Sequence, residues 1–186
     1  LDQAPVAPSE IHVIGASGGG HAALVMYLNS RHPVTSFSAW VPITDLVDWY
    51  HESVGRSRKY ALDILAATSD GKDDLDELEA RRRSPLHMPF RSTLPGKRTL
   101  YLRAGIHDGH TGSVPITHSL RFYNRVARKN GGDEADLVSV DDMFMLTVAR
   151  TFPRAEPDRY LGGRKVHYSR SFKNVHLTIF EGGHEM

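Results

Sequence analysis

Residues 11–24 read Ile-His-Val-Ile-Gly-Ala-Ser-Gly-Gly-Gly-His-Ala-Ala-Leu, and this stretch decides the fold. An apolar run ends at Ile14, a glycine-bounded turn follows, and a helical pattern begins near His21. Strand, tight turn and helix in direct succession are the context in which the pattern G-x-S-x-G has chemical meaning. We expect Gly15 and Gly19, two positions before and after Ser17, to be required because larger side chains would collide.

A serine on such a turn is predicted to be a nucleophile. Its hydroxyl would project from the end of the sheet, where a histidine can take the proton. The backbone N–H of Gly18, at the start of the helix, would then point to where an oxyanion forms and supply one oxyanion-hole donor.

Three other interpretations of the glycines were weighed. A phosphate-binding Walker loop needs Gly-Lys followed by Ser or Thr, whereas Gly20 is followed by His21. A dinucleotide-binding fingerprint on Gly18, Gly20 and Ala23 would place its first glycine inside the helix rather than at the strand end. A purely structural turn would leave Ser17 only as a helix cap.

The rest of the chain alternates short apolar runs with helical patterns. Strands are predicted at 11–14, 36–41, 99–104 and 175–180, and helices at 21–30, 60–67, 75–82, 116–130 and 141–151. Nearly continuous apolar strands are typical of a parallel sheet that helices cover on both faces. The sequence therefore predicts one α/β domain over residues 1–186.

An acid and a histidine should follow Ser17 in that order, each just beyond a later strand. Asp108 lies in a glycine-rich loop after the third predicted strand, and His184 lies after the fourth. Asp45, after the second strand, is a rival acid, and Asp108 could instead be a turn-forming residue. His184 could be an ordinary loop histidine. No metal site is predicted, because the pair His107 and His110 has no third ligand at a suitable spacing.

At these residues the chain resembles the α/β-hydrolase superfamily, in its prolyl-oligopeptidase-like and dienelactone-hydrolase-like serine hydrolase branch. The motifs that carry the resemblance are I-G-A-S-G-G-G-H (14–21), R-S-P-L (83–86), A-G-I-H-D-G-H-T-G-S-V-P-I-T-H-S (104–119) and F-E-G-G-H (180–184). The resemblance implies a three-layer α/β-hydrolase fold. It also implies that Ser17 is the nucleophile, His184 the general base and Asp108 the orienting carboxylate.

The chain also departs from the pattern of this family. The family sheet has eight strands, and its second oxyanion donor lies upstream of the serine turn. This chain is expected to lack the N-terminal strands and to be incomplete at both ends, which leaves an apolar edge on its first strand. Another copy of the chain or a missing N-terminal segment is expected to cover that edge. Residues 133–165 are expected to form an insertion or a flap over the site.

The amino-acid composition argues against nucleic acid and membranes as partners. The chain has 186 residues, is 40% hydrophobic and has a formal net charge of +1, so no broad basic field favours nucleic acid or anionic lipid. No apolar run approaches the roughly 20 residues that span a bilayer. The absence of cysteine excludes disulfides and a cysteine nucleophile but leaves the compartment open.

The predicted function is hydrolysis of a carboxylic ester through an acyl-enzyme, with no cofactor and no metal. By resemblance, carbohydrate-linked acyl esters are a candidate substrate class. The alternatives are a prolyl-oligopeptidase-like peptidase and a non-catalytic binding protein with the same fold. Trp40, Asp45 and Trp49 are candidate substrate-binding residues, because they lie in and after the second predicted strand.

Overall fold

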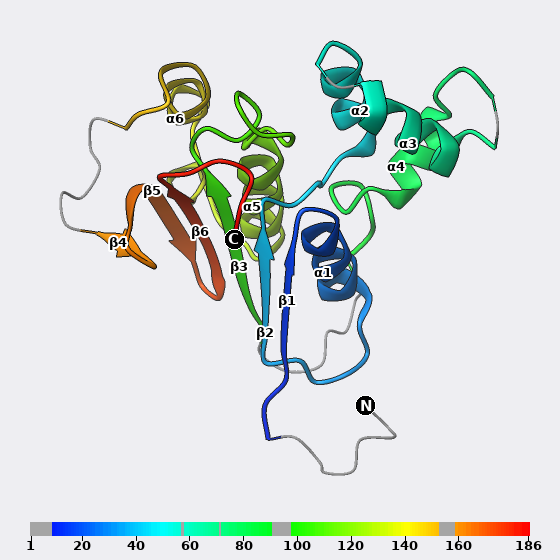
Figure 1. Cartoon of the computed structure of the whole chain (residues 1–186). Coiled ribbons are helices and arrows are strands. Elements are labelled where there is room, and N and C mark those ends of the chain that lie inside the picture. Colours follow the sequence, from blue (N-terminus) through cyan, green and yellow to red (C-terminus); the bar gives the residue numbers. More distant parts are fainter. Residues whose placement is uncertain (1–8, 57, 71, 91–97, 153–158) are drawn as a thin grey trace.

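The structure is a computed structural model that describes residues 9–56, 58–70, 72–90, 98–152 and 159–186. It is an α/β protein built on a six-stranded mixed sheet in the order β1-β2-β3-β6-β5-β4, curled into a half-barrel (Figure 1). The strands are β1 (His12–Ala16), β2 (Ser36–Trp40), β3 (Thr99–Gly105), β4 (Tyr160–Leu161), β5 (Arg164–Phe172) and β6 (Val175–Phe180).

The four strands predicted from apolar runs all form and are mutually parallel. The expectation of a purely parallel sheet is wrong, because β5 pairs antiparallel with β6, and β4 with β5. β5 was missed because its two buried residues, Val166 and Tyr168, are separated by a histidine and flanked by charged and hydroxyl residues, as on a strand with one exposed face. A two-residue hairpin joins β5 to β6, and Lys173 takes the positive φ of 50° that such a turn favours.

The predicted helices form with small shifts of their ends. The helices are α1 (Gly18–Asn29), α2 (Leu46–Val54), α3 (Arg58–Thr68), α4 (Glu77–Arg83), α5 (Thr117–Lys129) and α6 (Val140–Phe144), with a 3-10 turn at Glu134–Asp136 and a π-helical turn at Met145–Ala149. α2 was not predicted. Across the described ranges, no helix is long and apolar enough to cross a membrane.

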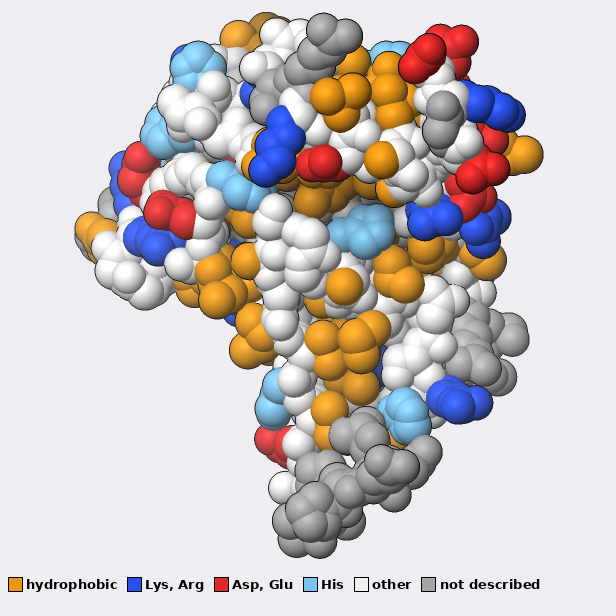
Figure 2. Space-filling model, turned by 45° about the vertical axis from the view of Figure 1, so that its right-hand side comes forward, with side chains coloured by type: hydrophobic (Ala, Val, Ile, Leu, Met, Phe, Trp, Pro, Cys, Tyr) orange, Lys and Arg blue, Asp and Glu red, His pale blue; other side chains and the backbone are white. Residues whose placement is uncertain are grey.

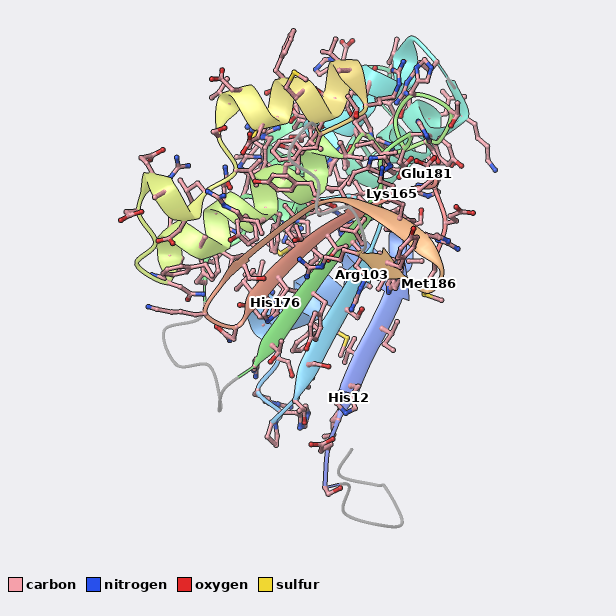
Figure 3. All side chains as sticks on the ribbon, turned by 90° about the vertical axis from the view of Figure 1, so that its left-hand side faces the viewer. His12, Arg103, Lys165, His176, Glu181 and Met186 are labelled. Atoms are coloured by element: carbon pink, nitrogen blue, oxygen red, sulfur yellow. The ribbon has the colours of Figure 1, made fainter. Side chains whose placement is uncertain are left out.

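Helices cover one face of the sheet rather than both. Buried side chains of α1 and α5 share a single core with alternate residues of the strands, such as Phe37, Leu102 and Leu177. Figure 3 looks onto the other face, where no described helix lies in front of the strands and where Arg103 and His176 are found. The expected three-layer arrangement is therefore a two-layer one in the described part of the chain.

β1 forms the edge of the sheet, as expected from the sequence. Among the described strands it pairs only with β2, and 65% of the Ile14 side chain is exposed. Met26 on α1 is exposed as well. Figure 2 shows hydrophobic side chains gathered over this side of the molecule. That another copy or another segment covers the edge stays a prediction.

Part of the segment expected as an insertion, residues 133–165, contributes to the main core. Leu137, Val138 and Leu146 are buried there. The side-chain amide of Asn124 on α5 bonds the backbone of Val138 in both directions, with its nitrogen donating to the carbonyl and its oxygen accepting from the N–H, each at 2.8 Å. Residues 153–158 lie outside the described residues.

Arg98 fixes the end of the helix that follows the serine turn. Its buried guanidinium donates hydrogen bonds to the carbonyls of Tyr27, Ser30 and His32, at 3.2, 2.6 and 2.9 Å. These carbonyls lie at or just beyond the C-terminus of α1, where helix geometry leaves such acceptors without partners.

Replacing Arg98 with Met should therefore lower the free energy of unfolding by about 3 kcal/mol, because three carbonyls lose a charged donor. Urea denaturation monitored by circular dichroism measures the change. Arg31→Met, at an exposed position near the same helix end, is the control and should stay within about 0.5 kcal/mol of the parent. A loss below about 1 kcal/mol for Arg98→Met would contradict this role.

Candidate active site

Three loops converge at one rim of the sheet. Ser17 follows β1, Asp108 follows β3 and His184 follows β6, and these strands run parallel, so their carboxyl ends meet at the same rim. His184 Nε2 lies 2.8 Å from Ser17 Oγ, and His184 Nδ1 lies 2.8 Å from Asp108 Oδ2. The three residues singled out from the sequence form one hydrogen-bonded chain.

Ser17 has a backbone conformation that non-glycine residues rarely adopt. Its φ is 54° and its ψ is −119°, and its N–H donates to the carbonyl of Trp40 at 2.9 Å. Such strain persists only where the surrounding structure imposes it, and it clusters at functional sites. The Ser17 side chain makes no capping bond to α1 and instead contacts His184, which disfavours the interpretation of Ser17 as a structural cap.

The glycines around Ser17 are not equally constrained. A Cβ on Gly15 would lie 2.1 Å from the carbonyl oxygen of Gly19, and one on Gly20 would lie 2.7 Å from that of Trp40. A Cβ on Gly19 would meet no atom within 4 Å. The expected collision at Gly19 is therefore wrong: the close approaches are at Gly15, which the turn packs against the helix, and at Gly20, which α1 packs against β2.

Asp108 is held rigidly behind the histidine. Its Oδ1 accepts the N–H groups of Gly109 and Val114 at 2.9 and 3.0 Å, while Oδ2 is left for His184. The carboxylate is buried, so it orients the imidazole without exchanging partners with solvent. A Cβ on Gly112 would lie 2.3 Å from Asp108 Oδ1, which explains the glycine in this loop.

A second histidine–carboxylate cluster, unnoticed in the sequence, joins the two loops. Glu181 bonds His107 Nε2 through Oε1 at 2.8 Å and His167 Nε2 through Oε2 at 2.6 Å. The bond to His167, and to a smaller extent the one to His107, holds the pKa of Glu181 below its usual value. The cluster ties β5 and the loop of Asp108 to the strand end that leads to His184. Because it needs β5 beside β6, spacing alone could not reveal it.

The rival acid Asp45 has a different position. Its Oδ1 caps α2 by accepting the N–H groups of Val47 and Asp48, and its Oδ2 bonds His87 Nε2 at 2.8 Å. A carboxylate with both oxygens engaged in this way acts as a helix cap. The candidate acid that contacts His184 is Asp108.

A cavity of about 470 Å³ adjoins His184. It is lined by Ser53, Arg56, Tyr60, His110, Thr111, Gly112, Ser113 and His184. The first three come from the region of α2 and α3, which lies beyond the carboxyl ends of the strands (Figure 1). Sequence reasoning missed this wall because the position of α2 depends on tertiary contacts. None of the described residues of the 133–165 segment lines it.

The proposed substrate-binding residues Trp40, Asp45 and Trp49 are not among the residues that line this cavity. Trp49 supports it from behind: its indole N–H donates to the carbonyl of Ser113 at 2.9 Å, and its ring packs against Tyr60. Trp40 lies on the uncovered face of the sheet, where the Arg103 guanidinium sits 4.9 Å from the centroid of its ring.

The N–H of Gly18 occupies the first position of α1, where helix geometry leaves amide donors without an intrahelical partner. A donor at this position is suited to a developing oxyanion. Within the described ranges, no group of three or more His, Asp or Glu residues is arranged to hold a metal ion.

The unequal glycines make a testable pair. Gly20→Ala should lower the free energy of unfolding by about 2 kcal/mol, because its methyl group meets rigid backbone. Gly19→Ala, the matched neighbour, should be neutral or stabilise by up to about 1 kcal/mol, since alanine favours a helix in open space. Chemical denaturation measures both, and equal losses in the two variants would contradict the geometry.

Comparison with known proteins adds no family. The sequence matches no protein-family model, and a search of curated proteins likewise finds no match.

Proposed function

We propose that this chain is a serine hydrolase that cleaves carboxylic esters through an acyl-enzyme intermediate. The observation that carries the proposal is the unbroken hydrogen-bonded path from Ser17 through His184 to Asp108, with 2.8 Å at each step. The strained backbone at Ser17, directly before α1, is the second support.

Each of these groups has a defined role in the proposed reaction. His184 Nε2 takes the hydroxyl proton as Ser17 Oγ attacks the ester carbonyl carbon, and Asp108 stabilises the imidazolium that forms. The amide of Gly18 donates to the oxyanion of the tetrahedral intermediate. The imidazolium then protonates the departing alkoxide, which leaves the acyl group on Ser17. A water molecule, deprotonated by the same imidazole, then attacks the acyl carbon, and the imidazolium returns the proton to Ser17 Oγ as the bond from Oγ to the acyl group breaks and the acid leaves.

Esters are favoured over peptides on chemical grounds. An ester carbonyl is more electrophilic than an amide and expels a better leaving group, so less stabilisation of the oxyanion is needed, and Gly18 is the one donor assigned in this chain. Carbohydrate-linked acyl esters are a candidate class through the resemblance to serine hydrolases. A prolyl-oligopeptidase-like activity is the alternative, and a panel of p-nitrophenyl esters and aminoacyl nitroanilides separates the two. We expect turnover of the esters, and turnover of the anilides alone would favour the peptidase.

A fluorophosphonate probe should label the chain at Ser17, because only a serine activated by a base attacks phosphorus rapidly. Peptide mapping by mass spectrometry locates the adduct. Ser17→Ala should abolish labelling, whereas Ser171→Ala, on β5, should label like the parent. Absence of an adduct on Ser17 in the folded protein would sink the proposal and favour a non-catalytic binding protein.

Asp108→Asn should reduce ester turnover by roughly 10³- to 10⁴-fold, because an amide cannot hold the imidazole in the tautomer that accepts the serine proton. Steady-state kinetics on a p-nitrophenyl ester measures the effect. Asp73→Asn, at an exposed loop position, controls for the loss of one negative charge. A loss of less than tenfold in the folded Asp108→Asn variant would remove Asp108 from the mechanism.

A further inference from the structure

The cavity beside His184 is lined by basic and hydroxyl-bearing residues but by no acidic residue. Its lining residues include Arg56, His110 and four residues that carry a hydroxyl group: Ser53, Tyr60, Thr111 and Ser113. No Asp or Glu is among these lining residues. Such a surface offers hydrogen-bond donors and positive charge but no carboxylate to balance them.

Arg56 is held in place yet keeps donors for a ligand. Its Nε donates to the backbone carbonyl of Glu52 at 3.3 Å, and one terminal nitrogen donates to the carbonyl of Gly109. A guanidinium has five N–H groups, so these two bonds to described residues leave three for a ligand. Among the described residues, no carboxylate forms an ion pair with Arg56.

The nearby acids are engaged elsewhere. The carboxylate of Glu52 bonds His118 Nε2 at 3.2 Å, and Asp108 is buried with both oxygens in use. Neither carboxylate therefore forms an ion pair with Arg56 among the described contacts.

Two hydrogen bonds connect the wall to the loop that carries Asp108. The bond from Arg56 to Gly109 and the bond from Trp49 to Ser113 both tie the α2–α3 region to the loop that carries Asp108. A cation that is already positioned loses little side-chain entropy when it binds an anion, and its planar fork matches a carboxylate.

We infer that this cavity is a recognition site for a carboxylate of the substrate, bound by Arg56, so that the esters cleaved at Ser17 carry a negative charge. The inference rests on the proposed function, which makes the substrate an ester. The lining of the cavity indicates that this ester carries a carboxylate. His184 borders both the cavity and Ser17, so a carboxylate held by Arg56 belongs to the same molecule as the reacting ester.

Two substrate pairs test the inference with the full chain. In the first the charge is on the acyl side: mono-4-nitrophenyl glutarate is compared with its methyl ester. In the second it is on the leaving group: 4-carboxyphenyl acetate is compared with 4-carbamoylphenyl acetate. The spontaneous hydrolysis of each ester, which for the glutarate includes attack by its own carboxylate, is subtracted, and the preference is read as the change in the ratio of kcat/KM between the parent and the Arg56→Gln chain.

We expect the charged member of at least one pair to be preferred about tenfold, a modest effect for a hydrogen bond to a charged group. Arg56→Gln should remove this preference, measured as the ratio of kcat/KM for the charged and the neutral ester within the same variant, and rising salt should weaken the preference in the parent. Arg31→Gln is the matched control, because it makes the same substitution at an exposed arginine just beyond the C-terminus of α1, at the end of the helix far from Ser17. No preference in either pair, or a preference that survives Arg56→Gln, would overturn the inference.

A binding measurement separates this inference from the proposed function. Glutarate is titrated calorimetrically into the Ser17→Ala chain and into the same chain carrying Arg56→Gln. Weaker binding in the double variant, by about fivefold or more, supports the site even if no ester is cleaved by the parent. Equal binding, or none in either chain, counts against the site even if Ser17 proves to be a nucleophile.

Discussion

The parallel register of β1, β3 and β6 is the constraint on which the rest of this structure depends. Because these strands point the same way, the loops that follow them meet at one rim, and residues separated by 167 positions come within 2.8 Å. The proposed chemistry depends on this contact between Ser17 and His184. Arg98 at one end of α1 and the tight packing of Gly20 on β2 at the other keep the helix, and with it Ser17, in register with the sheet.

The loop that carries Asp108 connects the site to the surrounding layers. Its carboxylate takes two backbone N–H groups and the imidazole, and its neighbour His107 reaches β6 through Glu181. Trp49 and Arg56 fasten the α2–α3 region to the same loop. The groups proposed for chemistry and those proposed for recognition are therefore joined through one loop, which helps to place a substrate carbonyl next to Ser17.

The sheet is half covered. α1 and α5 bury one face, while the other carries Trp40, Tyr101, Arg103 and His176, partly buried by stacking on one another. Burial lowers the pKa of both Arg103 and His176, so even the polar members of this face are partly withdrawn from water. The hairpin of β5 and β6 closes one side of the half-barrel, whereas β1 leaves the other side as an edge.

The sequence by itself determined the four parallel strands, the turn at Ser17 and the order of the serine, acid and histidine, because each depends on local apolar runs, glycines and neighbours along the chain. Only the tertiary structure decided that β5 lies antiparallel to β6, that no described helix covers one face of the sheet, that Asp45 caps α2 and that Arg56 lines a cavity. Those features depend on contacts between segments that are distant in the chain. The pattern of apolar residues along the sequence indicates which face of a helix or strand is buried, but not which other segment buries it.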